Sequence, residues 1–202
     1  MKIGIMGGTF NPVHNGHLAL AATAQKTAGL DEVWFMPSGL PAHKSNSELL
    51  SAKERLHMVT LAIAGIPYFK ASSFEIDRTG FTYTADTMEA LSKESPFDEF
   101  YFIIGGDSLM KFHHWVKPEV ISAHATLLAA GRSGYSKEEL KKQAMQLKQR
   151  FGTRIELLDM PEFQISSNEI RNLCKKEQPE LLREVLPQPV LSYIFEHKLY
   201  MN

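Results

Sequence analysis

The sequence predicts an α/β fold with a doubly wound, mostly parallel sheet, and three observations lead to this prediction. Four apolar runs, at residues 2–6, 33–37, 100–104 and 125–130, have the composition of strands buried on both faces. Segments with helical patterning separate these runs, and strands that alternate with helices are typical of parallel sheets. Glycine-containing turns follow the first and third runs, at the strand ends where open α/β sheets place their ligand sites.

The expected elements of the N-terminal half alternate between strand and helix. Ser51 and Glu54 have the spacing of a capping box, which predicts the start of a helix. Thr84 is the predicted N-cap of a further helix. The elements expected here are a strand at 2–6, a turn at 7–17, a helix containing 18–22 that stops at Ala28-Gly29, a strand at 33–37, a Pro- and Gly-rich loop at 38–45, a helix after Ser51, a strand at 68–76 and a helix after Thr84.

The C-terminal half continues the alternation and ends in short helices. Ser136 and Glu139 predict another capping box, at the start of a charged helix that runs to Arg150. Pro187 and Pro189 interrupt the last helical stretch. The elements expected here are a central strand at 100–104, glycines at 105–106, a helical turn at 108–115, strands at 125–130 and 154–160, and a helix capped at Ser166-Ser167. The whole chain, 1–202, is expected to form a single domain with a small C-terminal helical part.

Composition excludes several classes of protein. The formal net charge of −1 lacks the basic excess of proteins that coat nucleic acids. The single cysteine, Cys174, cannot form an internal disulfide framework and is typical of a reducing compartment. No apolar run approaches the roughly 20 residues of a membrane span, and no secretory leader precedes the first strand. We therefore expect a cytoplasmic protein that binds neither nucleic acid nor membrane.

The turn at 7–17 has the features of a phosphate-binding site. Gly7 and Gly8 let the backbone approach a ligand closely, and the N–H groups that open the next helix attract anions. His14 and His17 are three residues apart, so both rings can face the same way. Two histidines at this spacing also suit a metal, but no further ligand spacing accompanies them. The turn matches neither the dinucleotide fingerprint G-x-G-x-x-G nor the P-loop.

Two segments resemble the signatures of the nucleotidyltransferase superfamily. Residues 8–17 (Gly-Thr-Phe-Asn-Pro-Val-His-Asn-Gly-His) are similar to its H-x-G-H motif, and residues 165–171 (Ile-Ser-Ser-Asn-Glu-Ile-Arg) to its I-S-S-T-x-I-R segment. The resemblance implies a Rossmann-like nucleotidyltransferase fold. It also implies an enzyme that joins a nucleoside monophosphate unit to a phosphate acceptor.

Further segments narrow the resemblance to bacterial nicotinate-mononucleotide adenylyltransferases. Residues 37–44, 77–88, 102–109 and 193–200, together with Trp115, look like segments of that family, and the resemblance covers nearly the whole chain. It implies transfer of AMP from ATP to nicotinate mononucleotide, which yields nicotinate adenine dinucleotide and pyrophosphate in NAD biosynthesis. The resemblance implies Mg²⁺ as cofactor, which enters with ATP, and it implies no protein ligand to a metal. Whether the chain forms a homo-oligomer stays open.

The resemblance also assigns roles to individual residues. The implied catalytic residues are His14, His17, Lys44 and Arg171, which would align the phosphates and stabilise developing charge. Substrate binding on the nicotinate mononucleotide side falls to Lys44, Thr84 and Trp115. ATP binding falls to Gly8, Thr9, Phe10, His14, Gly16, His17, Gly105, Asp107, Ile165, Ser166, Ser167 and Arg171, with Gly105 and Asp107 at the adenosine end or the ribose.

Two positions depart from the family pattern, and two alternative functions stay open. Asn11 stands where the family more often has Asp, which we interpret as one carboxylate fewer beside the phosphates, and Ser133 follows Arg132 where Pro is common. One alternative is another enzyme of the superfamily, such as a phosphopantetheine adenylyltransferase or a cytidylyltransferase. The other is a module that binds adenine nucleotides without turnover.

Overall fold

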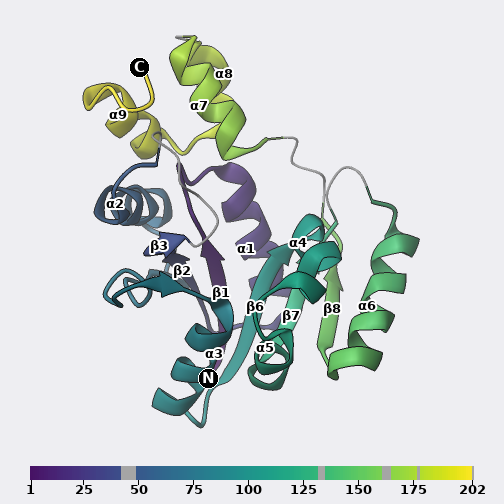
Figure 1. Ribbon diagram of the computed structural model, residues 1–202. Coiled ribbons are helices and arrows are strands. Elements are labelled where there is room, and N and C mark those ends of the chain that lie inside the picture. The colour runs from purple at the N-terminus through teal and green to yellow at the C-terminus, as the bar shows by residue number, and fades with distance from the viewer. Residues whose placement is uncertain (42–48, 132–134, 161–164, 177, 202) are drawn as a thin grey trace.

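Six parallel strands form the central sheet in the part of the chain that the structure describes (Figure 1). The computed structural model describes residues 1–41, 49–131, 135–160, 165–176 and 178–201. The strands are β1 (Lys2–Gly8), β2 (Glu32–Pro37), β4 (Phe69–Ala71), β6 (Glu99–Gly105), β7 (Ala125–Ala130) and β8 (Arg154–Leu158), and a separate parallel pair joins β3 (Leu40–Pro41) to β5 (Phe81–Thr82).

The order of the strands places a ligand site. Across the sheet they run β4-β2-β1-β6-β7-β8, which along the chain is the order 3-2-1-4-5-6 of a doubly wound sheet. The order reverses between β1 and β6, which pair in parallel from Lys2 opposite Glu99 to Ile5 opposite Phe102. Ligands of such sheets bind beyond the carboxyl ends of the strands at this reversal.

Helices cover both faces of the sheet, and each face has its own hydrophobic core. Side chains of neighbouring strand residues alternate between the faces. Ile103 therefore packs in one core with α1, α2 and the C-terminal helices, whereas Phe102 and Ile104 pack in the other with α3 to α6. The helices are α1 (Asn15–Ala28), α2 (Ala52–Ile63), α3 (Thr84–Glu94), α4 (Gly106–Lys111), α5 (Pro118–His124), α6 (Lys137–Phe151), α7 (Ser167–Lys175), α8 (Pro179–Val185) and α9 (Gln188–Glu196).

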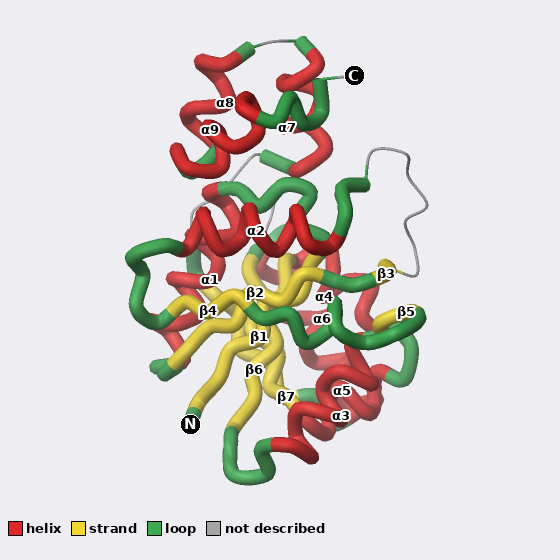
Figure 2. The backbone as a smooth tube through the Cα atoms, turned by 90° about the vertical axis from the view of Figure 1, so that its left-hand side faces the viewer, coloured by secondary structure: helices red, strands yellow, loops and turns green. Residues whose placement is uncertain are grey.

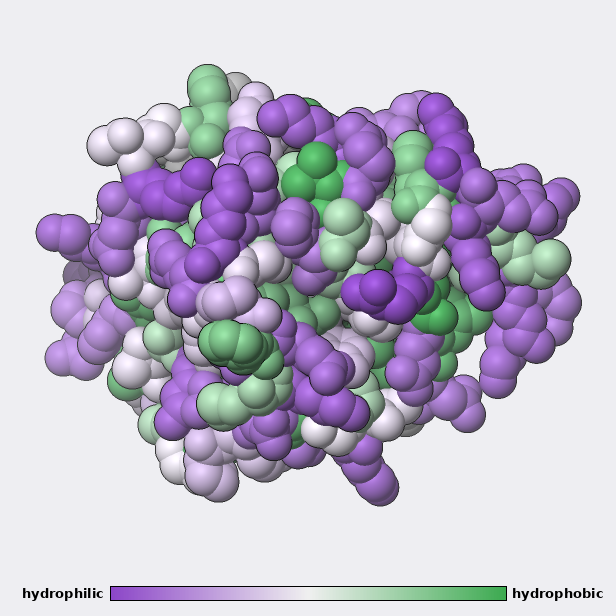
Figure 3. All heavy atoms as spheres, turned by 90° about the horizontal axis from the view of Figure 1, so that it is seen from below, coloured by the Kyte–Doolittle hydropathy of each residue, from purple (hydrophilic) through white to green (hydrophobic). Residues whose placement is uncertain are grey.

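The C-terminal helices lie at the carboxyl end of the sheet. Figure 2 shows α7, α8 and α9 gathered beyond α2, on the side toward which the strands run. Ile170, Leu182 and Ile194 are buried in the same core as α1 and α2. The last quarter of the chain is thus packed against the first, close to the loop that follows β1. The opposite end, seen from below in Figure 3, is mostly hydrophilic, with hydrophobic residues in small separate groups.

Most of the predicted elements are confirmed, including three of the caps. Ser51 and Ser136 each accept a hydrogen bond from the N–H group of the third helical residue, as predicted, and Ser166 does the same at α7. Gly29 ends α1 in the left-handed conformation that glycine favours. Helix α5 was not predicted, although Pro118 stands at its first turn, a position that proline favours.

Several predicted boundaries are wrong. The predicted strand 68–76 is only Phe69–Ala71, because the chain turns at Ser73, whose hydroxyl bonds the Asp77 carboxylate at 2.6 Å and whose carbonyl accepts the Ile76 and Asp77 N–H groups. Strand β8 ends at Leu158 rather than at residue 160. The helical turn expected at 108–115 begins earlier, as α4, and tightens into a 3₁₀ turn at Phe112–His114.

Thr84 is not the N-cap of α3. Tyr83 occupies that position and provides no side-chain hydrogen bond, and Thr84 is the first helical residue. Helix α3 therefore starts without the side-chain acceptor that the sequence led us to expect.

Candidate active site

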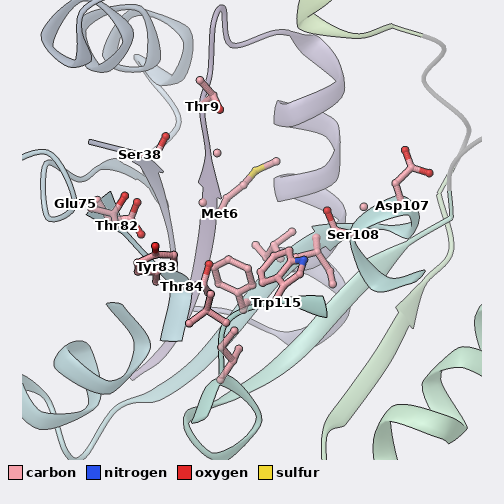
Figure 4. A pocket seen from close by; sticks show the side chains of 18 of the residues that line it. Met6, Thr9, Ser38, Glu75, Thr82, Tyr83, Thr84, Asp107, Ser108 and Trp115 are labelled. Carbon is pink, nitrogen blue, oxygen red and sulfur yellow. The ribbon is translucent and has the colours of Figure 1, made fainter. Parts of the chain in front are cut away.

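A cavity of about 510 Å³ opens where the strand order reverses (Figure 4). Residues from the carboxyl ends of β1 and β6 form its floor, among them Gly8 and Gly105. In Figure 4, Thr82, Tyr83 and Thr84 lie on one side of the end of β1, and Trp115, Ser108 and Asp107 lie on the other. The structure thus brings part of the predicted site residues to one cavity. They are Gly8, Thr9, His17, Thr84, Gly105, Asp107 and Trp115.

The two histidines of the glycine turn are in direct contact. His14 is the N-cap of α1, and the backbone N–H of His14 donates to Nδ1 of His17 at 3.2 Å. Their ring centroids are 3.7 Å apart. His14 is only 2% exposed, whereas His17 lines the cavity. Because Nδ1 of His17 accepts a hydrogen bond, Nε2 is the nitrogen that carries the ring proton and can donate to a ligand.

Phe10 and Gly16 support the turn from inside the protein and do not line the cavity. Phe10 is buried, and its ring lies edge-on to the His17 ring with the centroids 5.1 Å apart. A Cβ atom on Gly8 would lie 3.2 Å from the Phe10 ring, so this glycine keeps the backbone close to the aromatic side chain. Gly16 is buried in the first turn of α1.

The C-terminal motif contacts the same turn, across more than 150 residues of sequence. Nη1 of Arg171 donates to the carbonyl oxygen of Asn11 at 2.9 Å, and the Ser167 hydroxyl donates to the carbonyl oxygen of Pro12 at 2.9 Å. Ser166 caps the helix that carries both residues, and Ile165 packs against the core. The two predicted motifs therefore meet in space. The four residues of the C-terminal motif, Ile165, Ser166, Ser167 and Arg171, do not line the described cavity itself.

Asn11 has a role that the sequence did not suggest. Its Oδ1 accepts hydrogen bonds from the hydroxyl of Tyr200 at 2.8 Å and from the N–H of Leu50 at 3.3 Å. Burial raises the pKa of the Tyr200 hydroxyl far above its usual value, so this hydroxyl stays a donor. The Asn11 side chain therefore ties the turn to the end of the chain, a structural role that adds to the predicted place of Asn11 beside the phosphates.

Replacing Tyr200 with Phe is expected to lower the free energy of unfolding by about 1 kcal/mol, because the buried Asn11 oxygen loses its shorter hydrogen bond. Denaturant unfolding measures the change. Tyr193→Phe is the matched control, since the Tyr193 hydroxyl bonds no residue that the structure describes and its ring packs on His57 and His197. Equal losses in the two variants would contradict this role of Tyr200.

The N-terminus of α3 is open toward the cavity. Tyr83 supplies no side-chain cap, and the first three N–H groups of a helix have no partner within the helix. The Asp86 carboxylate in this turn lies 3.9 Å from Nζ of Lys117. Trp115 stands beside this helix start in the cavity wall, held edge-on against Phe102 with the ring centroids 6.0 Å apart.

The structure adds cavity residues that our reading of the sequence missed. Glu75 is buried, its Oε1 accepts the Thr87 hydroxyl at 2.8 Å, and burial raises the pKa of its carboxyl. The Ser38 hydroxyl is buried in the cavity wall and bonds no residue in the described part of the chain. Ser38 was within reach of prediction, because it directly follows a parallel strand; Glu75 was not, because the turn that carries it was predicted as a strand.

Some predictions fall outside what the structure describes. Lys44 and Arg132 lie in segments 42–48 and 132–134, outside the described residues.

Within the described residues, no group of three or more His, Cys, Asp or Glu side chains is arranged to hold a metal ion. No described helix is both long and apolar enough to span a membrane. Burial raises the pKa of the Cys174 thiol to about 11.

Comparison with known proteins places the chain in a family. Residues 5–173 match the cytidylyltransferase-like family. A probable nicotinate-nucleotide adenylyltransferase of Lachnoclostridium phytofermentans is 44% identical over 200 residues, which are 99% of each chain. A probable nicotinate-nucleotide adenylyltransferase of Dehalococcoides mccartyi is 40% identical over 204 residues, covering 99% of this chain and 97% of that protein.

Solved structures agree on the fold. The nicotinic acid mononucleotide adenylyltransferase of Plasmodium falciparum, complexed with NaAD, superposes with a TM-score of 0.82 at 21% identity over 98% of this chain and 97% of its own. The same enzyme complexed with APC gives a TM-score of 0.80 at 20% identity, over 98% and 96% of the two chains. The chain belongs to the cytidylyltransferase-like family and, within it, to the nicotinate-nucleotide adenylyltransferases.

Proposed function

We propose that this chain transfers AMP from ATP to nicotinate mononucleotide, giving nicotinate adenine dinucleotide and pyrophosphate. One observation carries the proposal. The glycine turn with His17 and the N-terminus of α3 line the same cavity. This helix N-terminus has no side-chain cap. The first feature suits the triphosphate of ATP, and the second suits an anionic ring substituent.

ATP would bind across the ends of β1 and β6. Gly8, Thr9 and His17 would face its phosphates, and Gly105 and Asp107 its ribose or adenine. Arg171 and Ser167 would act from α7, where they already hold the carbonyl groups of residues 11 and 12. A carbonyl oxygen that already accepts a bond from α7 would repel an incoming anion less than a free one.

Nicotinate mononucleotide would bind on the side of α3. Thr84 and Trp115 would contact the pyridine ring, Trp115 by stacking and Thr84 through the helix N-terminus that it opens. Lys44 is proposed to reach the phosphates from its loop. The Ser38 hydroxyl stands in the cavity wall as a further polar contact.

The chemistry needs no protein nucleophile. The acceptor is a phosphate monoester, whose second pKa near 6 leaves it mostly dianionic at neutral pH. The protein must align this oxygen with the α-phosphate of ATP and stabilise the charge that develops on the phosphates. His14, His17, Lys44 and Arg171 are the proposed catalytic residues for this purpose. Mg²⁺ binds phosphate oxygens and water readily, so it would enter with the triphosphate and neutralise part of its charge.

Incubating the purified chain with Mg²⁺, ATP and nicotinate mononucleotide is expected to release pyrophosphate and form the dinucleotide in equal amounts. Chromatography of the nucleotides and a coupled pyrophosphate assay measure both products. Parallel reactions with phosphopantetheine, and with CTP in place of ATP, test the other enzymes of the superfamily. Preferred turnover in either parallel reaction would overturn the assignment, and so would ATP binding with no release of pyrophosphate.

A further inference from the structure

Arg55, in the first turn of α2, is a buried cation outside the set of residues discussed so far as catalytic. It is 1% exposed, and it is the largest fully buried side chain among the described residues. Within the described part of the chain it pairs with no carboxylate. Burying an unpaired charge is costly, and burial lowers the pKa of this guanidinium. An apolar side chain at this position would avoid that cost.

Among the described residues, the guanidinium donates only to backbone carbonyl groups, and these belong to three separate loops. Nη1 donates to Thr9 at 2.7 Å, and Nη2 donates to Ser38 at 2.6 Å and to Gly39 at 3.1 Å. Nε donates to Leu50 at 3.1 Å. Hydrogen bonds from a charged donor are roughly twice as strong as neutral ones, so together they hold these loops firmly.

Two of these loops form the wall of the active-site cavity. Thr9 leaves β1 and Ser38 leaves β2, the neighbouring strand, and both line the cavity (Figure 4). The Ser38 N–H also donates to the carbonyl of Gly8 at 2.9 Å. Gly39 also lies close against the backbone at Glu75, since a Cβ atom on it would lie 2.5 Å from the carbonyl oxygen of Glu75. Arg55 thus adds a side-chain link between these two loops, beyond the end of the β1–β2 pairing.

We propose that Arg55 is a positioning residue for adenylyl transfer, which acts by holding the Thr9 turn and the Ser38-Gly39 loop at the separation that in-line attack requires. This inference rests on the proposed function. An error of about 1 Å in the placement of reacting groups can cost roughly a hundredfold in rate, so small movements of either loop matter. Lysine offers three donors at one point and cannot span the carbonyl groups that the planar fork reaches.

Arg55→Lys and Arg55→Met test the proposal against the wild-type enzyme. We expect kcat, measured with both substrates saturating and per mole of folded protein, to fall about tenfold or more in both variants. Leu147→Ala is the control, because Leu147 is a buried residue of α6 in the opposite core and does not line the cavity, so its truncation destabilises the fold and leaves the cavity lining in place. Its kcat is expected to match that of the wild type.

The outcomes separate positioning from mere stability. A kcat equal to that of the wild type in either folded Arg55 variant overturns the proposal, and so does failure of both variants to fold at the assay temperature. A loss of kcat in the folded Arg55 variants supports it when Leu147→Ala keeps the wild-type kcat, and an equal loss in Leu147→Ala overturns it. Failure of the proposed function itself is recognised separately, because the wild-type chain would then form no dinucleotide.

Discussion

Replacing His17 with alanine is expected to lower kcat by about a hundredfold or more, the usual scale for removing one donor to the transition state. Nδ1 of His17 already accepts the His14 N–H at 3.2 Å, so Nε2 is its donor, and the residue lines the cavity. This donor would serve phosphate oxygens on which charge develops during transfer. Steady-state kinetics with both substrates saturating measures the loss.

Two further variants separate this role from a structural one. His17→Asn keeps an acceptor for the His14 N–H but has no donor at the Nε2 position, so its kcat is expected to fall about as far as that of the alanine variant. His124→Ala is the matched control, because His124 ends α5 just before β7, at the opposite edge of the sheet. A His17→Asn enzyme with wild-type kcat would show that His17 serves only to start the helix.

Nicotinate mononucleotide is expected to exceed nicotinamide mononucleotide in kcat/KM by well over tenfold. A carboxylate at the start of α3 would gain hydrogen bonds from N–H groups that have no partner in the helix, as well as the positive end of the helix dipole, about 1 kcal/mol for the dipole alone. The amide has no charge and would present its NH₂ group to donors, leaving N–H groups unpaired at further cost. Asp86 lies beside Lys117, which reduces its competition for these donors.

Thr84→Pro tests this account at a single hydrogen bond. Thr84 is the first residue of α3, a position that proline accepts, and Tyr83 before it has the extended conformation that a following proline requires, with φ −113° and ψ 137°. The substitution therefore removes one N–H and keeps the helix, and the preference for the acid is expected to fall several-fold. Thr84→Ala removes the side chain but keeps the N–H, and should preserve the preference. Equal kcat/KM values for the two mononucleotides in the wild-type enzyme would refute this account of selectivity.

Features with local causes could be predicted from the amino-acid sequence alone. Short apolar runs predicted the parallel strands β1, β2, β6 and β7. A strand that is buried on both faces has a continuous apolar sequence, so it can be recognised without knowing which strands it pairs with. Capping boxes predicted the starts of α2 and α6, since both partners lie within four residues. The two motifs, at 7–17 and 165–171, predicted a phosphate site, because each is a short strand-to-helix or helix-start signal.

Contacts between segments that are distant in the sequence became visible only in the folded chain. Arg55 has the sequence context of an ordinary helical arginine, and its role becomes visible only once α2 lies against the ends of β1 and β2. Asn11 and Tyr200 are 189 residues apart and form one hydrogen bond. Glu75 enters the cavity because the chain turns after β4, where a hydroxyl-carboxylate bond competes with further strand pairing. Such contacts depend on how packed elements meet, and no local pattern encodes that arrangement.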